Sequence, residues 1–269
     1  MNISRDLADS NFTPSHMDCK LIHIDETDST NRYCKDCVLL HPKENLLVAT
    51  DYQTAGKGCG TNHWESERDQ NLLFSLLWHP DGLKAGRQFY ISMAVSQALK
   101  SVVSRYCRDE VKVKWPNDIY VGDRKICGIL IENQLKGDSI KQSIIGIGLN
   151  VNQTRFVSDA PNPVSLAQLT GQELDREQLL RELAQSLGHH LDMLGSASAE
   201  HALYEDYLDS LYRVHKDCLY RFPDGTEREC RLEVVYEDGR MALSWQTEKE
   251  SQTDRQVGIF AFKEVQFVI

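Results

Sequence analysis

Residues 124–132 read RKICGILIE, and this stretch decides the fold that we predict from the sequence. It is mostly apolar and follows the turn-forming residues Gly122-Asp123-Arg124, so we expect a strand here. Gly128 interrupts the apolar run, although glycine weakens the interior of a strand. We therefore expect a ligand or another backbone to pack against Gly128. Lys125 opens the strand, which would place its amine at the rim of whatever the strand lines.

The neighbouring residues predict an antiparallel meander around this strand. Turn-forming residues at 116–118, 122–124 and 136–138 separate four apolar stretches, namely Val111–Trp115, Ile119–Val121, Ile126–Glu132 and Ser143–Asn150. Upstream strands are expected at Lys20–Ile24, Leu46–Asp51 and Asn71–Trp78. Helices are expected from Asp28 or Ser29 to Leu40, at Ala85–Tyr106, at Glu177–Leu194 and at Ala199–Tyr212. The predicted class is α+β, with a mixed or antiparallel sheet packed with helices.

The pattern changes after Val214. Short apolar stretches separated by Pro223-Asp224-Gly225 and Glu237-Asp238-Gly239 predict a small β-barrel. We therefore divide the chain into an N-terminal tail (1–19), a large domain (20–213) and a small β-barrel domain (214–269).

Composition narrows the functional class. The 269 residues are 41% hydrophobic and 26% charged, which fits a globular enzyme and argues against a disordered chain. The net charge of −10 argues against a nucleic-acid binder, because phosphate contacts require basic surfaces. No apolar run reaches the roughly 18 residues that cross a bilayer, and the polar residues 1–16 lack an export signal. The eight cysteines include only one C-x-x-C pair, so we expect reduced thiols in the cytoplasm and no structural zinc site.

A glycine-rich segment follows the second predicted strand. Residues 53–64 read QTAGKGCGTNHW, and three glycines within five residues allow backbone amides to approach a ligand closely. Lys57 adds a positive charge, and Trp64 offers a face on which a flat base could stack. The spacing matches neither a Walker A loop nor G-x-G-x-x-G. The alternative interpretation is a mobile hairpin loop with no ligand.

Two further stretches carry candidate polar groups. In residues 112–118, KVKWPND, strand alternation places two lysines on one face, and Asn117 and Asp118 can hold a turn or a metal. A lysine directed at a phosphate offsets charge that develops during attack on phosphorus. Residues 146–152, GIGLNVN, form another strand with small residues and two amides at its end. The alternatives are solvated lysines with a turn, and a tight crossing of the sheet.

Taken in order, these stretches resemble the biotin protein ligase family, in a short form. The resemblance rests on DSTN at 28–31, QTAGKG at 53–58, KWPND at 114–118, RKICGILIE at 124–132 and GIGLN at 146–150. It implies a class II synthetase-like catalytic domain, followed by a small SH3-like β-barrel. It also implies a ligase that forms biotinyl-5'-AMP from biotin and MgATP. The same enzyme then transfers biotin to a lysine of a biotin carboxyl carrier domain, for example that of acetyl-CoA carboxylase.

The resemblance also assigns residues to each substrate. The residues implied for biotin are Ser29, Thr30, Asn31, Gln53, Gly56, Gly58, Lys125 and Gly128. Those implied for the nucleotide are Lys57, Cys59, Trp64, Lys114, Asn117, Asp118 and Asn150, and Asp118 is also the implied metal position. The implied catalytic residues are Lys125, Lys114 and Lys57. No protein nucleophile is required, and none is evident from the spacing.

Two departures from the family pattern lead to further expectations. Cys59 stands where many relatives have arginine or glutamine, and Lys57 replaces a common arginine, so we expect looser retention of the adenylate. About twenty residues precede Leu21, too few for a helix-turn-helix domain, so we expect no operator binding.

Two rival functions stay open from the sequence. One is a lipoate or octanoate ligase or transferase of similar fold, and the other is a non-catalytic biotin-responsive binding protein. The sequence does not specify the oligomeric state, although a homodimer is possible, and it does not identify the acceptor.

Overall fold

The large part of the molecule is built on a seven-stranded mixed sheet. The computed structural model describes residues 18–60, 62–157, 162–246 and 255–269. The strand order is β1-β2-β3-β7-β6-β5-β4, in which β1 pairs with β2 in parallel and every other neighbour is antiparallel. The strands are β1 (Cys19–Thr27), β2 (Asn45–Gln53), β3 (Leu72–Trp78), β4 (Val111–Lys114), β5 (Asp118–Val121), β6 (Arg124–Lys136) and β7 (Ser139–Leu149).

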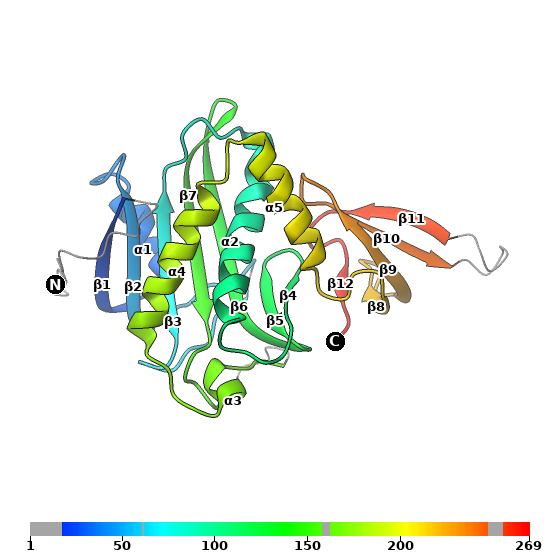
Figure 1. Cartoon of the computed structure of the whole chain (residues 1–269), viewed down its shortest axis with the longest axis horizontal. Helices are drawn as coiled ribbons and strands as arrows, with labels where there is room; N and C mark the ends of the chain where they lie inside the picture. The colour runs from blue at the N-terminus through cyan, green and yellow to red at the C-terminus, as the bar shows by residue number, and fades with distance from the viewer. Residues whose placement is uncertain (1–17, 61, 158–161, 247–254) are drawn as a thin grey trace.

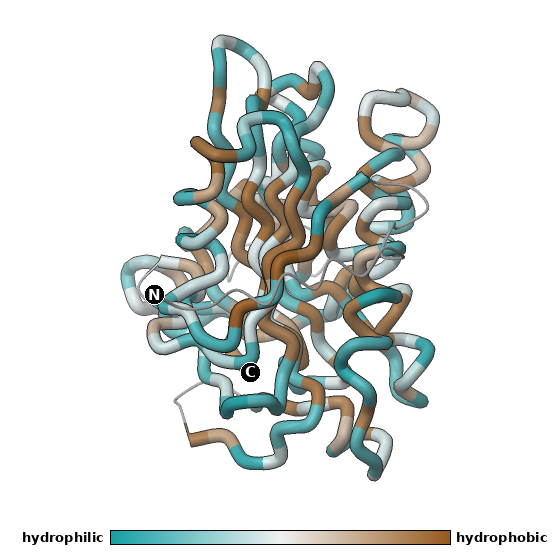
Figure 2. Tube along the Cα trace, turned by 90° about the vertical axis from the view of Figure 1, so that its left-hand side faces the viewer, coloured by the Kyte–Doolittle hydropathy of each residue, from teal (hydrophilic) through white to brown (hydrophobic). Residues whose placement is uncertain are grey.

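Helices cover both faces of this sheet. Three long helices lie in front of it in Figure 1: α2 (Gln88–Val103), α4 (Arg176–Leu191) and α5 (Ala197–Asp209). A short 3-10 helix, η1 (Ala85–Arg87), leads into α2. On the opposite face, α1 (Thr30–Cys37) packs on a separate apolar cluster that includes Ile22, Val48 and Ile144. The apolar strands form the centre of the molecule, with hydrophilic loops at their ends (Figure 2).

A small antiparallel sheet of the SH3-like kind follows the helices. Its strand order is β11-β10-β9-β8-β12. The strands are β8 (Asp217–Arg221), β9 (Glu227–Val235), β10 (Met241–Gln246), β11 (Arg255–Phe260) and β12 (Gln266–Phe267). Trp115 Nε1 donates to the Gly239 carbonyl at 2.9 Å, and the Tyr204 hydroxyl donates to the Val235 carbonyl at 2.9 Å. The turn after β4 and helix α5 therefore contact the small sheet and its β9–β10 turn, and the boundary at residue 214 stays a prediction.

The predicted α+β class and the meander of β4 to β7 are confirmed. The first helix ends at Cys37, three residues before the expected Leu40. Two elements were not predicted, namely α3 (Leu166–Thr170) and β12, because five and two residues are too short for a periodic pattern. The predicted tail lies almost entirely outside the described residues. No helix in the described ranges is both long and apolar enough to span a bilayer.

Candidate active site on the α1 face of the sheet

Two glycines form a flat floor on the α1 face of the sheet. Gly128 of β6 and Gly148 of β7 are register partners, and Gly128 also pairs with Asp118 of β5. The indole ring of Trp64 lies on this floor, because a Cβ atom would come within 2.8 Å of the ring at Gly128 and 2.4 Å at Gly148. The expectation of close packing at Gly128 is confirmed, but the packing group is a side chain of the same protein, not another backbone.

The indole N–H group of Trp64 makes no hydrogen bond within the described part of the chain. Its Nε1 atom is buried and has no hydrogen-bond partner among the described residues. An unpartnered buried donor costs about 1–3 kcal/mol. The arrangement therefore favours a ligand or a ring movement that satisfies this group.

A pair of lysines borders the floor. Lys125 Nζ lies 2.7 Å from Asp118 Oδ1 and 5.7 Å from the centre of the Trp64 ring. Lys114 Nζ lies 5.4 Å from the Tyr120 ring centre and 5.1 Å from that of Phe267. Burial lowers the pKa of Lys114, and the positive charge of Lys125 adds to this effect, whereas Asp118 opposes it. The rim is thus positively charged and suited to anionic groups.

A buried polar network lies at the start of α1. Thr30 and Asn31 are each 4% exposed, and the Ser75 hydroxyl lies 2.7 Å from Thr30 Oγ1 and 2.6 Å from Asn31 Oδ1. The backbone N–H of Thr30 donates to Gln53 Oε1 at 2.8 Å. Because that oxygen is occupied, the Gln53 amide nitrogen is the group available to a ligand. Ser29 is the buried N-cap of α1, and its backbone N–H donates a hydrogen bond to Asp28 Oδ1 at 2.7 Å.

Asn31 is held in place by Glu132. Its Nδ2 donates to Glu132 Oε2 at 2.9 Å, and Lys35 Nζ lies 2.6 Å from Glu132 Oε1. Burial alone would raise the pKa of Glu132, but hydrogen bonds from Lys35 and Asn31 outweigh burial and lower it. Gly146 makes room for Asn31, since a Cβ there would be 2.2 Å from Asn31 Oδ1. This network closes the end of the floor opposite Lys125.

The glycine-rich segment forms a narrow hairpin above the floor. Gly58 N–H donates to the Asn62 carbonyl at 2.8 Å, and Trp64 N–H donates to the Gly56 carbonyl at 3.0 Å. A Cβ at Gly56 would be 2.7 Å from the Trp64 carbonyl oxygen, so this approach requires glycine. Lys57 is exposed, and its charge acts on Glu132. The positive charge of Lys57 therefore acts on the polar network at the start of α1.

Cys59 is influenced by three charged residues, Lys263, Lys125 and Asp118, which the sequence did not predict to lie near one another. Burial raises the pKa of its thiol, Lys263 and Lys125 lower it, and Asp118 raises it. Lys263, from the small domain, also reaches Gly60, where a Cβ would be 2.4 Å from its Nζ. Lys263 was missed because 203 residues separate it from Gly60 and no local pattern marks it. Thr61 in the predicted loop lies outside the described residues.

The two predicted asparagines have structural partners. Asn117 Nδ2 donates to the Ile129 carbonyl, and Asn150 Nδ2 donates to the Val164 carbonyl at 3.0 Å. Asn150 Oδ1 is buried and has no partner in the described part of the chain. Asn117 thus joins β5 to β6, whereas Asn150 retains one free acceptor.

The metal position implied for Asp118 is a single carboxylate already paired with Lys125. Among the described residues, Asp118 belongs to no group of three potential metal ligands. This arrangement fits Mg²⁺ that enters with nucleotide phosphates, since Mg²⁺ commonly uses one or two carboxylates and the phosphates themselves.

Part of the chain matches a known protein family, and several known proteins are similar to it in sequence. A family model described as "Biotin/lipoate A/B protein ligase family" matches residues 24–150. The bifunctional ligase/repressor BirA of Bacillus spizizenii is 30% identical over 168 residues, covering 61% of this chain and 51% of that protein. The biotin--[acetyl-CoA-carboxylase] ligase of Paracoccus denitrificans is 29% identical over 188 residues, covering 65% and 76%. The match to BirA thus spans about half of that relative's length.

The fold is similar to solved biotin protein ligases. The enzyme from Aquifex aeolicus in complex with biotin and ATP aligns with a TM-score of 0.69 and 22% identity, covering 92% of this chain and 99% of that chain. At this identity the likeness establishes the fold alone. The family match, the sequence relatives and this fold agree with one another. Residues 24–150 therefore form a domain that matches the biotin/lipoate A/B protein ligase family.

Proposed function

We propose that this chain is an ATP-dependent biotin–protein ligase that uses the floor of Gly128 and Gly148 as its biotin site. The observation that carries the proposal is the Lys125 ammonium, which lies at the rim of a backbone floor closed at its other end by a buried polar network. A small carboxylate with an apolar body and a polar ring fits these three features. The sequence relatives named as biotin ligases support the same substrate.

Biotin would lie along the floor with its carboxylate at Lys125. The ring of Trp64 lies on the floor, so it has to move for biotin to lie there. The Gln53 amide nitrogen and the residues Ser29, Thr30 and Asn31 would then contact the ureido ring. A lipoyl or octanoyl chain offers no such hydrogen bonds and would leave these buried groups unpaired, which costs about 1–3 kcal/mol for each group.

The first chemical step joins two anions. The biotin carboxylate attacks the α-phosphate of MgATP, and pyrophosphate leaves. Lys125 and Lys114 lower the cost of the charge that gathers on the phosphate oxygens. Asp118 is the nearby carboxylate that would hold an Mg²⁺ ion accompanying ATP, and this ion would offset negative charge on the pyrophosphate.

The second step transfers the acyl group. The amine of a carrier lysine attacks the acyl carbon of biotinyl-5'-AMP, an amide bond forms, and AMP leaves. Because the adenylate reacts with water, the hairpin of Gly56 to Trp64 would shield it. Lys263 approaches that hairpin from the small domain and would face the adenylate phosphate. The proposed acceptor is a biotin carboxyl carrier domain, and the Paracoccus relative is named as a ligase for acetyl-CoA carboxylase.

The cysteines support a reducing compartment. All eight cysteines lie in described parts of the chain, and all are free thiols. Extracellular domains commonly form disulfides, whereas cytosolic proteins keep their thiols reduced. We therefore place the enzyme in the cytoplasm.

The decisive experiment is transfer of labelled biotin to a purified carrier domain in the presence of MgATP. We expect label on one carrier lysine and pyrophosphate exchange that depends on biotin. Exchange with lipoate in place of biotin would assign the chain to the rival lipoate ligases. Biotin binding without exchange or transfer would instead support a non-catalytic binding protein.

A further inference from the structure

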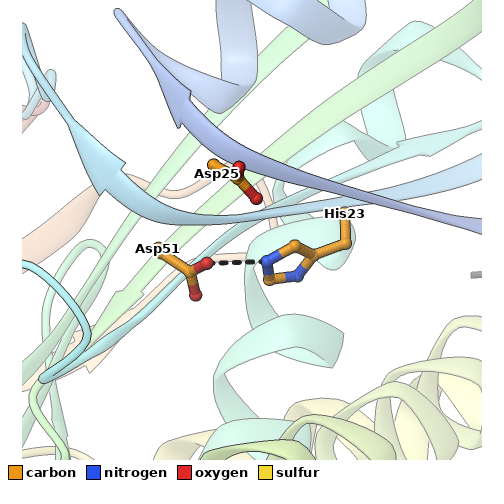
Figure 3. A group of neighbouring side chains, drawn as sticks. All are labelled: His23, Asp25 and Asp51. Atoms are coloured by element: carbon orange, nitrogen blue, oxygen red, sulfur yellow. Dashed lines mark hydrogen bonds and ion pairs between the residues drawn. The ribbon is translucent and has the colours of Figure 1, made fainter. Parts of the chain in front are cut away.

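A second cluster of possible ligands lies on the other face of the sheet. His23 and Asp25 of β1 and Asp51 of β2 each offer a donor atom, and these atoms lie within 4.8 Å of one another. His23 Nε2 is 2.9 Å from Asp51 Oδ2 (Figure 3). The three side chains come from two adjacent strands and point toward one another (Figure 3).

The parallel register brings these groups together. Ile24 pairs with Thr50, and Glu26 pairs with Tyr52, so Asp25 and Asp51 lie opposite each other. Like charges that face each other on neighbouring strands destabilise a sheet. A cation between them would remove this repulsion. His23 precedes Asp25 by two residues and therefore shares its face.

The charges around the cluster leave an excess of carboxylate. Arg176 of α4 reaches Asp51 Oδ1 at 3.5 Å and Asp69 Oδ1 at 3.3 Å. Asp25 has no side-chain hydrogen bond or ion pair within the described ranges. Arg176 thus pairs with two carboxylates, and exposed Asp25 adds a third negative charge beside Asp51.

We propose that His23, Asp25 and Asp51 form a binding site for a divalent first-row transition-metal ion such as Zn²⁺. One imidazole and two carboxylates suit zinc, cobalt, nickel and manganese, whereas Mg²⁺ prefers oxygen ligands alone. Bonds of about 2.1 Å would place the donor atoms about 3–3.5 Å apart. The His23 and Asp51 atoms, 2.9 Å apart, would separate slightly to reach this spacing, and exposed Asp25 can rotate toward them.

The position of the site indicates its role. In β1, His23 lies on the same face of the sheet as Cys19, which belongs to the core under α2 and α4. Ile22 and Ile24 lie on the other face, toward α1. The cluster and the floor under Trp64 therefore lie on opposite faces of the sheet. A metal here would join the edge strand β1 to β2, and it would be separate from the Mg²⁺ that accompanies ATP.

The test is a titration of the metal-free full chain with Co²⁺, followed by absorption spectroscopy and calorimetry. Cobalt serves as a probe because bound thiolates add an intense near-ultraviolet band, which separates cysteine binding from this site. We expect one ion per chain without that band. His23→Gln and Asp25→Asn should each weaken binding by at least about 10-fold. The matched control is His41→Gln, since His41 lies beside one carboxylate, Glu44, at 3.1 Å.

Each outcome decides the proposal. Loss of cobalt binding in both site variants, with retention in His41→Gln, supports it. Asp25 is exposed, so Asp25→Asn should keep the fold, which circular dichroism checks. Absence of binding to the wild type, binding with a thiolate band only, or unchanged binding in both site variants would overturn it.

Discussion

Lys125 and Asp118 form an ion pair across β5 and β6, with 2.7 Å between Nζ and Oδ1. Asp118 is also the register partner of Gly128, so the pair borders the glycine floor. A substrate carboxylate that reaches Lys125 therefore competes with Asp118 for the same ammonium group. Replacing Lys125 removes the positive charge from this site. Replacing Asp118 keeps the charge but removes the partner that holds the lysine side chain in place.

Lys125→Met should lower the rate of biotin-dependent pyrophosphate exchange by about 100-fold or more, because the principal cation at the reacting carboxylate is lost. Lys84→Met is the matched control, since Lys84 forms an exposed ion pair with Asp138. Exchange as fast as in the wild type would show that Lys125 lies outside the active centre.

Gly148→Ala should weaken biotin binding by at least about 10-fold. The added methyl group would come within 2.4 Å of the Trp64 ring and would raise the floor on which biotin is proposed to lie. Equilibrium binding of labelled biotin measures the effect. Gly86→Ala, which meets no atom within 4 Å, should bind normally. Equal affinity in Gly148→Ala would place biotin elsewhere.

Cys59→Arg should slow the release of biotinyl-5'-AMP. The charges acting on Cys59 include Asp118, so an arginine here could pair with that carboxylate and cover the adenylate. Single-turnover trapping of released adenylate measures the rate, with Cys59→Ser as the uncharged control. If the arginine variant releases adenylate as fast as the serine variant, the loop composition does not govern retention.

Glu132→Gln should reduce the free energy of unfolding at neutral pH but not in strong acid. The folded-state pKa of Glu132 is lowered, so its charged form stabilises the fold above the ordinary glutamate value of about 4.3. This contribution disappears as the pH falls through the lowered pKa. Urea unfolding at pH 7 and near pH 3 measures the change. A difference between wild type and variant that stays constant with pH would contradict the ion pair with Lys35.

Ser75→Ala should reduce the free energy of unfolding by about 1–3 kcal/mol. The buried hydroxyl contacts Thr30 and Asn31, and its loss leaves polar atoms unpaired at the start of α1. Ser198→Ala on the exposed side of α5 is the control and should change little. Urea unfolding measures both variants, and equal midpoints would mean that the network does not support the fold.

The sequence predicted those features that a local pattern can encode. The glycine within β6 correctly indicated a close approach, and the alternating strands of the meander were recognisable from their turns. The sequence could not show that the ring on Gly128 belongs to Trp64, because that contact depends on how the hairpin folds back. Ser75 and Glu132 were missed as partners of Asn31, since β3 and β6 reach α1 only through the order of the sheet.

The floor beneath Trp64 consists of main chain, and this limits how the protein can be redesigned. Hydrogen bonding between β6 and β7 fixes the position of the main chain that forms the floor. Because both residues of the floor are glycines, neither has a side chain that could be exchanged for a smaller one. Attempts to admit a bulkier analogue of the proposed ligand, biotin, should therefore vary the Trp64 indole above the floor or the Asn31 amide at its end. Libraries that diversify the two glycines would yield mostly blocked enzymes.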